Sequence, residues 1–114
     1  MAFVRASGYN QNTMADKSGR MVIGACTIAL QIPGCTSLKQ KRQVLKSVIA
    51  RVRNEFNVSI AEVGHQDNWQ LATLAVVCVS TEAGYVHGLL ERVVRTIDSG
   101  HFDLVLLDYE TELL

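Results

Sequence analysis

From residue 21 onward the chain is built of blocks in which apolar and polar residues follow different periods. In residues 21–32 the even positions form the more apolar side, which predicts a β-strand ended by a Pro-Gly pair. Residues 57–64 and 69–79 read as two more strands around a short polar connection. The second of these is apolar almost throughout, as expected of a central strand covered on both faces. Residues 102–113 predict a last strand.

Two segments repeat their apolar residues at helical spacing. Residues 38–55 gather them in one arc of the helical wheel, after a Ser-Leu-Lys-Gln capping box that begins at Ser37. A second helix starts after a cap at Ser80 or Thr81 and ends at Gly100. The resulting order, β-α-β-β-α-β, predicts an α+β, ferredoxin-like βαββαβ fold: a four-stranded antiparallel sheet with two helices on one face.

Composition limits the class of protein. The chain has 114 residues, of which 48% are hydrophobic and 19% charged, which is enough for one globular domain. We assign this globular domain to residues 21–114. Residues 1–20 are polar, lack the apolar region of a secretory signal, and form a leader outside the domain that is flexible or an artificial extension. No stretch is long and apolar enough to cross a membrane.

The three cysteines have spacings that fit neither a zinc site nor a disulfide framework. We expect Cys26 and Cys78 in the core and Cys35 to be reachable in a loop. Free thiols suit the cytoplasm, and we expect neither a metal nor a cofactor.

The sheet face away from the helices should carry residues such as Ile23, Ala25 and Thr27. This face is too apolar to be freely solvated, so we expect a homo-oligomer, a dimer or higher, that covers it with another copy. The alternative is that residues 1–20 fold back over it. Neither central strand carries an aromatic ring, which argues against RNA bases stacking on the sheet.

Charge is balanced overall, with eleven basic and eleven acidic residues, but residues 37–54 hold only basic ones. Arg42, Lys46 and Arg53 fall within about 60° of Lys39 on the helical wheel, and Lys41 lies in the apolar arc, from which it must reach outward. The candidate RNA-binding residues are therefore Lys39, Lys41, Arg42, Lys46 and Arg53. The alternative is that these cations are merely solvated or are paired with acids of the last strand, namely Asp103, Asp108, Glu110 and Glu112.

His65, Asp67 and Trp69 share the connection between the middle strands. A polar turn supplies no defined pocket for acid–base catalysis, so we favour a turn stabilised by a side-chain hydrogen bond and assign no catalytic residue. The alternative is a pocket at a subunit interface that contains these three residues and serves a small ligand or a reaction.

Several segments resemble the YlxP-like family of small bacterial proteins, a domain of unknown function. They include Ser-Leu-Lys-Gln-Lys-Arg from Ser37 and Glu-Val-Gly-His-Gln-Asp from Glu62. The resemblance covers residues 21–114 and implies a ferredoxin-like fold, an oligomeric state and genes near ribosome-maturation factors. It implies no activity and no catalytic residue. We therefore expect a non-enzymatic, cytoplasmic accessory factor that binds structured RNA or a ribosomal particle, or else an oligomeric protein-interaction module.

Overall fold

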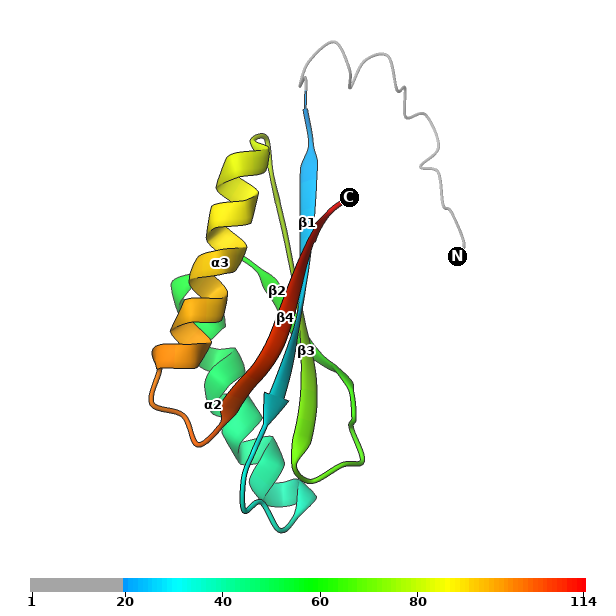
Figure 1. Cartoon of the computed structure of the whole chain (residues 1–114). Coiled ribbons are helices and arrows are strands. Elements are labelled where there is room, and N and C mark those ends of the chain that lie inside the picture. The colour runs from blue at the N-terminus through cyan, green and yellow to red at the C-terminus, as the bar shows by residue number, and fades with distance from the viewer. Residues whose placement is uncertain (1–19) are drawn as a thin grey trace, which may run out of the picture.

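The computed structural model describes residues 20–114, so the interpretation of the leader lies, apart from Arg20, outside the described residues. The elements are β1 (Val22–Gln31), α2 (Leu38–Glu55), β2 (Ser59–Gly64), β3 (Leu71–Ser80), α3 (Ala83–Ser99) and β4 (Val105–Leu113). The strands form one antiparallel sheet in the order β2-β3-β1-β4. Both helices lie on the same side of it (Figure 1). The α+β ferredoxin-like prediction is confirmed.

Element boundaries differ from the sequence prediction where tertiary contacts decide them. Helix α3 is capped by Glu82 without a side-chain hydrogen bond. The predicted caps were wrong because β3 continues through Ser80, which still pairs with Val22 of β1. Strand β4 starts three residues late because Phe102 and Leu104 instead pack against the core.

The core lies between the sheet and the two helices. The even positions of β1 face it, so Cys26, Ile28 and Leu30 are buried as predicted, and Cys78 is buried on β3. Cys35 is also buried, at 1% exposure, so the expectation that it is reachable was wrong. The tight turn after Ile32 folds this thiol inward, where its Sγ donates to the carbonyl of Ser37 at 3.2 Å.

The opposite face of the sheet is not covered by any other described segment and is called the open face here (Figure 1). The odd positions of β1 and β3 point to it, including the exposed Val77 and Val79. The β1–β4 register places Asp108, Glu110 and Glu112 beside β1 residues of this same face. Asp108, Glu110 and Glu112 therefore lie on the side of the sheet away from the helices, whereas Asp103 precedes β4 and borders a hollow with Gln40 and Val44 of α2. No described helix is long and apolar enough to traverse a bilayer.

Candidate nucleic-acid interface on helix α2

The start of α2 is set by local hydrogen bonds. Ser37 Oγ accepts from the backbone N–H of Gln40 at 3.1 Å, as the capping box predicts. The Gln40 side chain does not complete the box at Ser37, because its Oε1 accepts from the backbone N–H of Thr36 at 3.0 Å. The cap fixes which residues of the helix face the core and which face solvent.

Four of the five exposed cations of α2 lie along one edge of the helix and are called the basic row: Lys39, Arg42, Lys46 and Arg53. Lys39, Lys46 and Arg53 are spaced seven residues apart, which places successive members about 10 Å apart along the axis. Arg42 lies between the first two. The row is therefore about 20 Å long and lies along one edge of the helix.

Ion pairs leave the basic row available. In residues 20–114 these pairs are Lys41–Glu62 and Arg51–Glu55, and His87 Nε2 lies 3.9 Å from a carboxylate oxygen of Glu91. Asp108, Glu110 and Glu112 cannot neutralise the row within one chain, because they lie on the open face, and Asp103 forms no ion pair among the described residues. Arg51, the remaining exposed cation of α2, donates to Glu55 and lies over the Phe102 ring, 5.9 Å from its centroid.

Lys41 does not belong to the interface, and its assignment as an RNA-binding residue was wrong. Its side chain is 1% exposed, and Nζ donates to the carbonyls of His65 at 2.6 Å and Asn68 at 2.7 Å. A carboxylate oxygen of Glu62 lies 2.9 Å from the same nitrogen. The ammonium group needs no water because the β2–β3 turn folds over the start of α2 and supplies these acceptors. The clue in the sequence was a lysine inside the apolar arc.

His65, Asp67 and Trp69 lie exposed on the β2–β3 turn. The side chain of Asn68 accepts from the backbone N–H groups of Gln70 and Leu71, at 2.8 and 3.0 Å. The predicted turn stabilised by a side-chain hydrogen bond is thus confirmed. The alternative, a pocket between subunits at these residues, stays a prediction, and they do not border the groove described next.

A groove of about 510 Å³ runs between α2 and the edge strand β2. Its floor is mainly aliphatic and three members of the basic row border it. The lining residues are Arg42, Leu45, Lys46, Ile49, Ala50, Arg53, Ile60, Ala61 and Glu62. The charge of Glu62 is offset by Lys41, so the border of the groove is net positive. No pattern in the sequence predicts this groove, because it depends on how far β2 stands from the helix.

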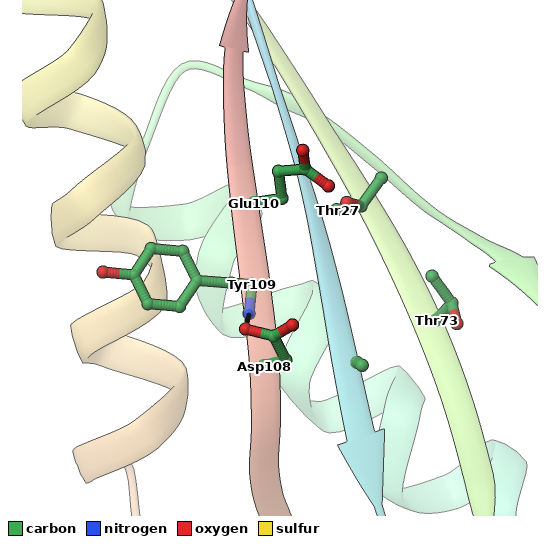
Figure 2. A pocket seen from close by; sticks show the side chains of 6 residues that line it. Thr27, Thr73, Asp108, Tyr109 and Glu110 are labelled. Atoms are coloured by element: carbon green, nitrogen blue, oxygen red, sulfur yellow. Dashed lines mark hydrogen bonds between the residues drawn. The ribbon is translucent and has the colours of Figure 1, made fainter.

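The open face has a smaller hollow of about 90 Å³ beside β4 (Figure 2). Thr27, Thr73, Asp108 and Glu110 border it, whereas the Tyr109 side chain points to the helix side. There the Tyr109 hydroxyl donates to Glu91 of α3 at 2.9 Å, which raises the pKa of the tyrosine. The hollow is acidic and therefore repels phosphate.

In the described part of the chain no cluster of three or more His, Cys, Asp or Glu side chains is arranged to hold a metal ion.

These features define a small α+β domain with a ferredoxin-like sheet and a basic helical edge. Residues 23–111 match the family described as a protein of unknown function, DUF503, and the chain belongs to that family. It is 48% identical over 63 residues to the uncharacterized protein YlxP of Bacillus subtilis (strain 168), covering 55% of this chain and 68% of that protein. The resemblance to the YlxP-like family is confirmed.

Among solved structures, the de novo designed protein Foldit4 resembles this chain with a TM-score of 0.50 and 18% identity. The match covers 83% of this chain and 97% of the designed one. At that identity the likeness concerns the fold alone.

Proposed function

We propose that this protein is a non-enzymatic, cytoplasmic accessory factor that binds structured RNA or a ribosomal particle through the basic row. The single observation that carries the proposal is the basic row itself: exposed cations along one edge of α2, without a carboxylate partner among the described residues. Such a surface attracts a polyanion, since it can neutralise phosphates and release their counterions.

The position of the basic row suits contacts to the phosphate backbone. Contacts of this kind orient a protein on RNA and carry no direct sequence information. The open face is poorly suited to the same ligand because Asp108, Glu110 and Glu112 line one side of it. We therefore expect RNA on the helical side of the sheet.

The test is a titration of ribosomal RNA fragments against the wild type and the Lys39→Ala/Arg42→Ala/Lys46→Ala variant. With about four phosphate contacts, log K should fall with log salt concentration with a slope of roughly −3 to −4. The triple variant should bind at least tenfold more weakly and show a slope reduced by roughly 2–3. The control is Arg92→Ala/Arg95→Ala, which removes exposed charge from α3 and should change affinity less than the triple variant.

Equal affinity of the wild type and the triple variant contradicts the proposal. So does the absence of RNA binding by the wild type at low salt.

We also propose that two copies associate through the open face. Val79, Val105 and Val77 are 62%, 46% and 40% exposed there, an unusual amount of aliphatic surface for one sheet face. Along its central strands the face carries small residues such as Ala25, Thr27 and Ala75, so a second sheet can approach closely. A second copy is favoured because the face lacks cations among the described strand residues, which disfavours both RNA and acidic protein segments.

A further inference from the structure

We propose that the groove between α2 and β2 receives an unpaired RNA base, so that the preferred ligand is a single-stranded segment rather than a continuous duplex. The inference rests on the proposed function and specifies the substrate class of the same site. It joins two observations that phosphate binding alone leaves unexplained: the apolar floor of the groove and the arginines on its border.

The floor of the groove suits a base better than a phosphate. Ile49, Ala50 and Ala61 present an aliphatic surface above the buried Leu45 and Ile60, and a phosphodiester group gains nothing from contact with it. A base has flat faces of low polarity that become available once it leaves the stack. The groove, about 510 Å³ in volume, is open to solvent on one side, so one face of a base can lie on its floor.

The border of the groove supplies both contacts that a nucleotide needs. Arg42 and Arg53 offer planar guanidinium groups, which stack on unpaired bases and also bind phosphate. Arg53 is held in place, because its Nη2 donates to the carbonyl of Ile60 at 3.2 Å while the side chain remains exposed. Lys46, on the same border, is a compact charge suited to a neighbouring phosphate.

An acidic peptide added as a strand to β2 is the main competing occupant, and two features disfavour it. The carbonyl of Ile60 already accepts a hydrogen bond from Arg53, so a new strand would compete with this side chain. The β2–β3 register also shifts between Glu62 and Gly64, so a regular strand would meet an irregular edge. The edge strand is therefore partly protected against pairing.

The experiment compares two RNAs of equal length, a hairpin with an unpaired loop and a fully paired duplex, by fluorescence anisotropy. We expect the wild type to bind the hairpin about tenfold more tightly than the duplex, which is the gain in affinity that stacking of one base provides. Ala50→Leu fills the groove at an exposed helical position and should abolish this preference. The matched control, Gln43→Leu, adds the same side chain at an exposed α2 position outside the groove lining and should leave both affinities unchanged.

A second variant separates stacking from charge. Arg42→Lys/Arg53→Lys keeps every positive charge, so the salt slope should persist while the preference for the loop falls about tenfold. Circular dichroism and thermal unfolding establish that each variant is folded.

The outcomes separate the two proposals. Equal wild-type affinity for loop and duplex, or an unchanged preference in Ala50→Leu, overturns the base-binding inference and leaves the proposed function standing. No binding of either RNA at low salt overturns both. Binding of an alternating Leu-Glu peptide that Ala50→Leu abolishes, without RNA binding, assigns the groove to protein and overturns both as well.

Discussion

At the scale of single residues, Lys41 shows how position overrides residue type. Lysines 39, 41 and 46 follow one another on the same helix, yet Lys41 is buried while Lys39 and Lys46 are exposed. The two segments on which the family resemblance depends meet at the Lys41 ammonium group, since Glu62 and His65 are two of its partners. The contact holds the β2–β3 turn against the start of α2, so this lysine supports the candidate site without touching its ligand.

Replacing Lys41 by methionine should destabilise the fold by about 3–5 kcal/mol, because it leaves a carboxylate and two carbonyls without their donor. Urea denaturation followed by circular dichroism measures this loss. Lys46→Met, at an exposed position of the same helix, should change the free energy of unfolding by less than about 0.5 kcal/mol. Equal effects of the two substitutions would show that the buried ammonium group contributes no special stability.

Alkaline pH should weaken the fold. Burial raises the pKa of the Cys26 and Cys78 thiols, and the hydrogen bond to Glu91 raises that of Tyr109. A group whose pKa is higher in the folded state stabilises the fold fully at pH values below its unfolded pKa, which is about 8.5 for Cys and 10 for Tyr. This stabilisation is lost as the pH rises through the pKa of the folded state.

Urea midpoints measured from pH 7.5 to pH 10.5 should therefore decrease. Tyr109→Phe should flatten the upper part of this decrease, since phenylalanine neither ionises nor hydrogen-bonds to Glu91. A midpoint that stays constant over this range contradicts the prediction.

At the scale of elements, the approach of α3 to β1 depends on a missing side chain. A Cβ at Gly24 would collide with Val86 and lie 2.9 Å from Leu90 Cδ1, both on the buried side of α3. The helix packs this closely because the strand offers only backbone at that point.

Gly24→Ala should therefore lower the free energy of unfolding by about 1–3 kcal/mol, the usual penalty for overpacking a core. Gly88→Ala is the matched control on α3, where an added Cβ meets nothing within 4 Å. It should stabilise the protein by up to about 1 kcal/mol, because alanine favours the helix. Thermal unfolding of the two variants measures both effects, and a neutral Gly24→Ala would mean that α3 shifts freely on the sheet.

Helix α2 was predicted with its observed ends, Leu38 and Glu55, whereas the start of α3 was not. The difference has a physical cause. Ser37 caps α2 through a hydrogen bond to the near neighbour Gln40, so the signal is local. The candidate caps of α3 lie where strand pairing continues to Ser80, and the sheet takes precedence over the cap.

At the scale of the whole molecule, the basic row and the acids of β4 lie on opposite sides of the sheet. The basic row lies on the helical side, and Asp108, Glu110 and Glu112 lie on the open face. The proposed RNA site and the proposed dimer contact are therefore separate surfaces, and a dimer would present two basic rows on its outer sides. Like charges would also disfavour placing one β4 directly over the other.

The dimer is tested by sedimentation equilibrium. We expect the wild type to be dimeric at micromolar concentration and Val77→Lys to be monomeric, because the new charge would be buried in the contact, opposite Ala25 and Ser59 and without a carboxylate beside it. Val77 is 40% exposed in the single chain, so the substitution should leave the fold intact. Gln43→Lys on α2 is the control with the same added charge. A monomeric wild type at about 100 µM, the upper end of such affinities, would falsify the dimer proposal.

The sequence by itself determined the order of the elements and the buried face of β1. Both follow from periods of two and 3.6 residues, which are local properties of strands and helices. It also identified the exposed cations Lys39, Arg42, Lys46 and Arg53. Only the tertiary structure decided that Lys41 is buried, that Cys35 turns inward and that a groove lies between α2 and β2. These features depend on segments far apart along the chain, such as Lys41 and Asn68, whose contact no local pattern encodes.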